Sequence, residues 1–198
     1  AASQSRATSI VYCRRFAARG YACFSVGYRL TQELTAPQVV PIRRNRTQVS
    51  RGRIDYVRGL LGLPLATDAE LLNGAEAAIA DVAMAARFVM GNAARFSVDT
   101  ARVALGGFSA GAFASVYSAY ALGIPAAAII SISGGMDTED ANWYLHGARG
   151  QPPVLAFSSE NDLPGINERT RTLTDGAAQA GLGVRRYFVP GKPHFYTA

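Results

Sequence analysis

The stretch LGGFSAGAFAS, residues 105–115, joins two different sequence patterns at a single serine. The residues before it, RVALGG, are apolar and suit a strand, whereas AGAFASVYSAYALG after it is alanine-rich and typical of a helix. Gly107, Ala110 and Gly111 leave little side-chain bulk around Ser109, and larger side chains at either glycine are expected to clash. The pattern G-x-S-x-G between a strand and a helix predicts a sharp turn that exposes the serine hydroxyl.

Strand and helix patterns alternate along most of the remaining sequence. Further strands are predicted at residues 21–28, 126–135, 154–159 and 184–191, and further helices at residues 11–20, 75–96 and 167–181. This alternation predicts an α/β fold with a mostly parallel sheet and helices on both faces. Right-handed crossovers with short connections place the loops after the strands at one edge of the sheet, where chemistry is expected.

Residues 29–74 interrupt this order with three prolines, a cluster of arginines and one short apolar patch, GLLGLPL. We predict a long irregular insertion with about one helical turn, which serves as a cover over the active site. The cluster consists of Arg43, Arg44, Arg46, Arg51, Arg53 and Arg58. They lack the interleaved aromatic residues that stack on bases, so we expect a solvated or interface-forming loop and no binding of nucleic acid.

The overall composition fits one folded domain over residues 1–198. Hydrophobic residues make up 49% of the chain and charged residues 17%, which excludes a disordered or fibrous protein. No apolar run reaches the roughly 18 to 20 residues that span a bilayer, so no membrane span is expected. The N-terminus lacks the layout of a secretory signal, and the sequence assigns neither a cytoplasmic nor a secreted location.

The two cysteines, Cys13 and Cys23, fall on a predicted helix and on the predicted strand after it. This placement is compatible with a disulfide between them, but we expect two buried thiols instead. No cluster of cysteine and histidine has the spacing of metal ligands, so neither a metal nor another cofactor is expected.

A serine nucleophile needs a base, because its own hydroxyl is only weakly acidic. Of the two histidines in the sequence, His194 follows the last predicted strand and so lies at the same sheet edge as Ser109. His146 follows an earlier strand by more than a dozen residues, and we interpret it as a surface or substrate-pocket residue. Phe108 and Phe195 flank these candidates and are expected to form walls of the site.

A carboxylate that orients the imidazole completes such a site. Asp162 comes just after the strand at 154–159 and is the preferred candidate. Glu160 is its main rival, and Asp137 is a more distant alternative. The backbone N–H of Ala110, at the start of the helix after the serine, is expected to point toward a developing oxyanion.

The chain order Ser109, Asp162, His194 on alternating strands and helices resembles the α/β-hydrolase fold. More narrowly, it resembles the carboxylesterase and lipase branch related to hormone-sensitive lipase and to small microbial esterases. The stretches that carry this resemblance are FAARGYACFSVGYRL, residues 81–115, ENDLPG and PGKPHFY. The resemblance implies a nucleophile, an acid and a base at these three positions, one oxyanion amide at Ala110, a small-molecule ester as substrate, and no cofactor.

The resemblance also implies parts that this sequence does not contain. Relatives carry a His-Gly-Gly loop that completes the oxyanion hole, further strands before it, and a helix after the catalytic histidine. We therefore expect a domain that is incomplete at both ends, or one that completes its site by forming a homo-oligomer. An impaired hydrolase that acts as a binding or assembly module stays open as an alternative, as does acyl transfer or peptide cleavage on the same triad.

Overall fold

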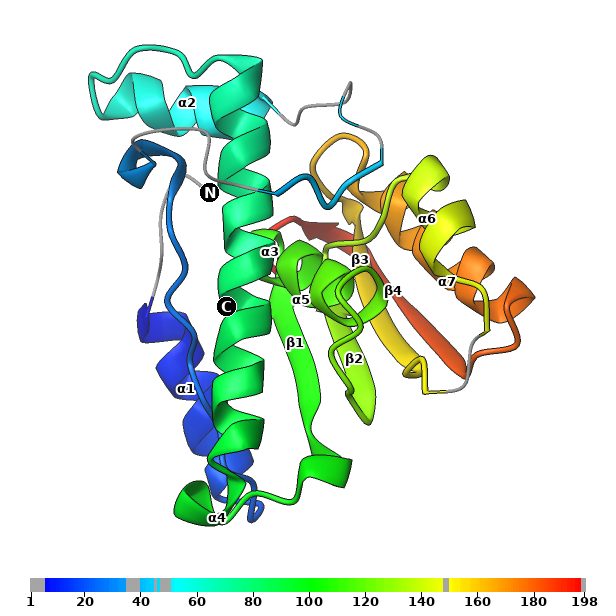
Figure 1. Ribbon diagram of the computed structural model, residues 1–198. Helices are drawn as coiled ribbons and strands as arrows, with labels where there is room; N and C mark the ends of the chain where they lie inside the picture. Colours follow the sequence, from blue (N-terminus) through cyan, green and yellow to red (C-terminus); the bar gives the residue numbers. More distant parts are fainter. Residues whose placement is uncertain (1–5, 35–39, 45, 47–50, 148–149, 197–198) are drawn as a thin grey trace.

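The computed structural model describes residues 6–34, 40–44, 46, 51–147 and 150–196. Its sheet has four parallel strands in the order β1-β2-β3-β4 (Figure 1). They are β1 (Ala104–Phe108), β2 (Ala128–Ile132), β3 (Val154–Asn161) and β4 (Val184–Pro193). The prediction of an α/β fold with a parallel sheet is confirmed, because every pair of neighbouring strands runs in the same direction.

One face of this sheet carries the core. The helices α5 (Ala110–Tyr120), α6 (Thr138–Tyr144) and α7 (Ile166–Gln179) follow β1, β2 and β3 in turn. Because each strand adds to the same side of the preceding one, right-handed crossovers bring all three helices over the same face. On that face Ile129 and Ala156 are fully buried. Their neighbours Ile130 and Phe157 lie on the opposite face, which the sequence also predicts to carry helices, and they are only partly buried.

The long helix α3 (Asp68–Gly91) packs against α5 and confirms the helix predicted at 75–96, but it begins earlier. A capping box sets its start: Thr67 Oγ1 accepts from Glu70 N–H at 3.2 Å, and Glu70 Oε2 accepts from Thr67 N–H at 2.7 Å. The helix ends at Asn92, and the short helix α4 (Ala93–Phe96) follows it.

The predicted strand at residues 21–28 is wrong within the described part of the chain. These residues belong to no helix, strand or ladder, and all except Tyr28 are exposed. A strand is stabilised by pairing with a neighbour, and the described sheet ends at β1 without a strand next to this segment. The aromatic and small apolar residues of this segment therefore favour a strand without supplying the neighbour that a strand needs.

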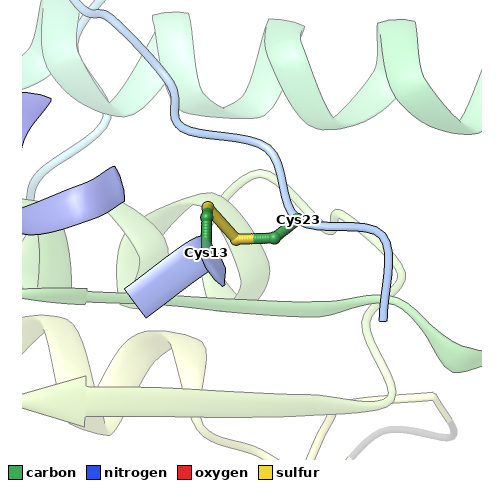
Figure 2. Close-up of a disulfide and its surroundings, with 2 residues drawn as sticks. All are labelled: Cys13 and Cys23. Carbon is green, nitrogen blue, oxygen red and sulfur yellow. A yellow bond between two sulfur atoms is a disulfide. The ribbon is translucent and has the colours of Figure 1, made fainter. Parts of the chain in front are cut away.

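The expectation of two buried thiols is also wrong. The helix α1 (Arg6–Ala17) ends in a turn at Gly20, and the chain then returns alongside α1. This return brings the Cα atoms of Cys13 and Cys23 to 5.1 Å from each other, and the two sulfurs form a disulfide (Figure 2). Neither cysteine is buried: Cys13 is partly exposed and Cys23 is exposed.

The segment at 29–74 is more regular than predicted, since it holds the 3₁₀ turn η1 (Thr31–Glu33), the helix α2 (Gly52–Leu60) and the first turns of α3. Several of its arginines pair with carboxylates of this chain: Arg43 with Asp137, Arg46 with Glu76, and Arg51 with Asp68. The side chain of Arg53 lies outside the described residues. Much of the positive charge of this segment therefore serves internal ion pairs, whereas the sequence favoured a solvated or interface-forming loop.

No helix in the described parts of the chain combines the length and the apolar character needed to cross a membrane.

Candidate active site

Ser109 lies on the turn between the end of β1 and the start of α5, as the motif predicts. Its φ of 54° and ψ of −115° are strained for a residue other than glycine. A Cβ added at Gly107 would lie 2.5 Å from the carbonyl carbon of Gly111, so strand and helix approach each other closely there. A Cβ at Gly111 would meet open space, so the expected clash at this second glycine is wrong.

His194 comes directly after β4 and is almost fully buried. Its Nε2 lies 3.0 Å from Ser109 Oγ, and its Nδ1 makes a short hydrogen bond with Asp162 Oδ1. The rings of Phe108 and Phe195 lie 4.8 and 5.1 Å from the imidazole, centroid to centroid. The imidazole is therefore held between two polar partners and two aromatic walls.

Asp162 follows the last residue of β3, and its side chain is inaccessible to solvent. Its Oδ1 also accepts from the N–H of Leu163 at 2.9 Å, while its Oδ2 accepts from Ser133 Oγ at 2.6 Å and from Ser159 Oγ at 3.2 Å. Burial by itself would raise the pKa of Asp162, but hydrogen bonds from Ser133, His194 and two backbone amides outweigh it and hold the pKa below its ordinary value. The carboxylate is thus ionised near neutral pH.

The structure does not bring the rival candidates to the imidazole. Glu160 is exposed, and its Oε2 accepts from the N–H of Gly191 at 2.7 Å. Asp137 is buried between Arg43 and Arg169, with N–O distances of 2.6 and 2.7 Å. His146 is exposed on the loop after α6, on the segment that follows β2.

Two residues beside the carboxylate were not singled out from the sequence. Ser133 follows β2, and its hydroxyl contacts both Asp162 and the hydroxyl of Tyr196, which is 3.1 Å away. The sequence does contain one signal for Ser133, since it is a polar residue directly after a predicted parallel strand. Functional groups often lie at the sheet edge where such strands end. No such signal marks Tyr196, whose position depends on the turn after His194.

Ala110 is the first residue of α5, so its N–H belongs to the first helical turn, where amides have no partner within the helix. The positive end of the helix dipole adds to its attraction for negative charge. Among the described residues, no group of three histidine, cysteine, aspartate or glutamate side chains is placed to hold a metal ion.

Comparisons with known proteins agree with this architecture. The BD-FAE family model matches residues 69–135, which run from the start of α3 to the loop after β2. No curated protein matches the sequence. A puromycin-hydrolyzing peptidase of Mycobacterium tuberculosis superposes with a TM-score of 0.50 at 18% identity, over 62% of this chain and 22% of that one. An arylesterase superposes with a TM-score of 0.51 at 14% identity, over 62% of this chain and 54% of that one.

An esterase from the fungus Rhizomucor miehei superposes with a TM-score of 0.48 at 20% identity, over 61% of this chain and 52% of that one. The aligned part of this chain corresponds to 28% of a thermostable esterase and to 57% of the esterase PE8. The chain thus spans well under two thirds of the length of these structures. The sheet order, the strained serine between β1 and α5, and the fold-level matches together show that this chain has an α/β-hydrolase fold and resembles carboxylesterases.

Proposed function

We propose that this chain is a serine hydrolase of carboxylic esters, in which Ser109 is the nucleophile, His194 the general base and acid, and Asp162 the residue that orients the imidazole. The observation that carries this proposal is the position of the imidazole of His194. One ring nitrogen lies 3.0 Å from Ser109 Oγ, and the other is bonded to a buried carboxylate. Structural networks seldom place a strained serine, a histidine and a carboxylate in this relation, which nucleophilic catalysis requires.

In the proposed reaction, His194 Nε2 takes the proton of Ser109 while Oγ attacks the ester carbonyl carbon. The carbonyl π electrons move to the oxygen, which becomes an oxyanion near the N–H of Ala110. The tetrahedral intermediate then expels the alcohol, which receives the proton from His194, and an acyl-serine remains. A water molecule repeats these steps in place of the serine hydroxyl and releases the carboxylic acid.

The ionised state of Asp162 supports the role of the imidazole in each proton transfer. A carboxylate beside Nδ1 fixes the tautomer in which Nε2 is free to accept the serine proton, and it stabilises the imidazolium that forms. The hydrogen bonds that hold the pKa of Asp162 below its ordinary value keep this charge in place.

The aromatic side chains at the site favour an apolar group on the substrate. Phe195 is 51% exposed although it lies next to the buried His194, so it adds apolar surface beside the imidazole. Phe108 packs within 5.7 Å of it, centroid to centroid. An acyl or alcohol group with apolar surface would remove this aromatic surface from water, at about 25 cal/mol for each Å² buried.

The proposal includes a cover formed by part of the segment at 29–74. Residues 40–44 run next to α6 (Figure 1). There Arg44 N–H donates to Asp140 at 2.6 Å, and the Tyr144 hydroxyl donates to the carbonyl of Ile42. Arg43 is buried against Asp137, which lies three residues beyond Gly134, and a Cβ added at Gly134 would lie 3.3 Å from Ser109 O. These anchors support a fixed cover near the edge where β2 ends.

The substitution Ser109→Ala tests the proposal. Turnover of p-nitrophenyl butyrate should fall at least about 10⁴-fold, because the variant has no hydroxyl that can be acylated and His194 has no serine proton to accept. Ser97→Ala is the matched control, since Ser97 also has a positive φ, of 52°, but is exposed at the end of α4. Parental turnover in Ser109→Ala would overturn the assignment, and an unreactive parent protein would favour a binding module instead.

A further inference from the structure

A serine that the proposed reaction does not use lies behind the carboxylate of Asp162. Ser133 follows β2 as Ser109 follows β1, and its N–H donates to the carbonyl of Phe157 at 2.8 Å, next to the ladder between β2 and β3. Ser133 is fully buried, and its φ of 51° lies in the left-handed region that favours glycine. Glycine would adopt this φ more easily, and the chain does have glycine at the next two positions, 134 and 135. A serine at 133 therefore points to a role for its hydroxyl group.

The hydroxyl of Ser133 has a defined direction. It lies 2.6 Å from Asp162 Oδ2 and 3.1 Å from the hydroxyl of Tyr196. An ionised carboxylate can only accept, and a serine hydroxyl has one proton. Ser133 therefore donates to Asp162, and Tyr196 donates to Ser133. Burial raises the pKa of Tyr196, so this phenol keeps the proton that it donates.

Ser133 is a more dedicated partner of Asp162 Oδ2 than the other hydroxyl nearby. Ser159 Oγ lies 3.2 Å from Oδ2 but also 3.1 Å from the carbonyl of Pro193, and its single proton can serve only one of these acceptors. The N–H of Ser159 is 3.3 Å from Oδ2. Without Ser133, the outer oxygen of the carboxylate would keep only these longer contacts.

We propose that Ser133 is a positioning residue for the acid of the active site, and that Tyr196 in turn orients the Ser133 hydroxyl. The inference rests on the proposed function and deepens it. Ser133 fixes Oδ2, the N–H of Leu163 contacts Oδ1, and the carboxylate plane is thereby turned so that Oδ1 faces the imidazole of His194. The ordered chain of donors runs from Tyr196 through Ser133 to Asp162.

The substitution Ser133→Gly tests this role, because glycine suits the observed φ and removes only the hydroxymethyl group. We expect kcat for p-nitrophenyl butyrate to fall about 10- to 100-fold with little change in KM, since a hydrogen bond to a charged group is lost from the catalytic apparatus. Tyr196→Phe should lower kcat about threefold, because it removes a neutral donor one step further away. Ser133→Cys, which keeps a weak donor, should fall between parent and Ser133→Gly.

Ser97→Gly is the matched control for the backbone, because it replaces another serine with positive φ far from the proposed chemistry. It should leave kcat and KM unchanged. A kcat for Ser133→Gly within about twofold of this control would overturn the positioning role. If Ser133→Gly does not fold, the same comparison is made with Ser133→Cys and Tyr196→Phe, and parental kcat in both overturns it.

A second measurement separates this inference from the proposed function. The proton between His194 Nδ1 and Asp162 can be followed by NMR whether or not an ester is hydrolysed. Its resonance should shift in Ser133→Gly and stay in place in Ser97→Gly. Parental activity in Ser109→Ala would reject the proposed function alone, whereas an unmoved resonance in Ser133→Gly would reject the positioning role alone.

Discussion

Replacing Asp162 by asparagine probes the site most sharply, because the two carboxylate oxygens face donors on every side. Oδ1 accepts from His194 Nδ1 and from the N–H of Leu163, and Oδ2 accepts from Ser133 and Ser159. An asparagine must present its NH₂ group to one of these two sets. In either orientation the NH₂ group meets a backbone N–H, that of Leu163 on one side or that of Ser159 on the other, and the amide oxygen has no charge to stabilise an imidazolium.

The structure therefore predicts a large loss of activity with a moderate loss of stability. In a Ser-His-Asp triad this substitution lowers kcat by about 10⁴-fold, which corresponds to about 5.4 kcal/mol of transition-state stabilisation. The unmatched donors around the amide should cost about 1.5–3 kcal/mol of folding free energy. Initial rates with p-nitrophenyl butyrate and urea unfolding of the same preparation measure both quantities.

Glu160→Gln is the control for Asp162→Asn, because Glu160 lies two residues away, is exposed, and bonds to Gly191 instead of to the imidazole. It should keep kcat within about threefold of the parent, as a surface change distant from the chemistry. Near-parental kcat in Asp162→Asn, or a large loss confined to Glu160→Gln, would refute the assignment of the acid.

Three further predictions concern stability. The pKa of Asp162 is lower in the folded chain than the ordinary value of 3.8, so around and below pH 3.8 the unfolded chain binds more protons than the folded one. The free energy of unfolding should therefore decrease as the pH falls through this range. Unfolding measured at a series of acidic pH values should show a shallower decrease in Asp162→Asn. Gly107→Ala should destabilise by at least about 3 kcal/mol or prevent folding, since its Cβ would lie 2.5 Å from backbone, whereas Gly111→Ala should be tolerated; equal melting temperatures would contradict the packing described for the turn. Reduction of the Cys13–Cys23 bridge, which closes a loop with a sequence separation of 10, should cost about 2–3 kcal/mol without changing kcat, and an unchanged urea midpoint under dithiothreitol would count against the bridge.

The parts of the fold that depend on local pattern could be predicted from the sequence. The turn at Ser109 combines a strand, small residues and a helix within one short stretch, and it folds as that stretch predicts. The strands and helices after it also follow from alternating apolar patterns, except for α6, a seven-residue helix that the sequence analysis does not predict. The predicted helix at 75–96 begins too late because that prediction rests on the apolar periodicity alone. The start of α3 is set instead by reciprocal hydrogen bonds between Thr67 and Glu70, which come before the periodic apolar residues.

Other features depend on partners that are distant in sequence. Residues 21–28 have the composition of a strand, but pairing is decided by which backbone lies alongside, and the described sheet offers none there. The approach of Cys13 to Cys23 depends on how the turn at Gly20 directs the chain. Ser133 gains its role only when the ends of β2 and β3 and the segment after β4 meet around one carboxylate.

The reactivity of the Ser109 hydroxyl toward a fluorophosphonate tests the central claim most directly. The modified residue is identified by mass spectrometry, and the inactivation rate is compared between the parent and His194→Gln. A base 3.0 Å from the hydroxyl predicts a single adduct at Ser109 and a rate that falls at least about 10³-fold without the imidazole. An adduct at another residue, or an unchanged rate in His194→Gln, would contradict the account.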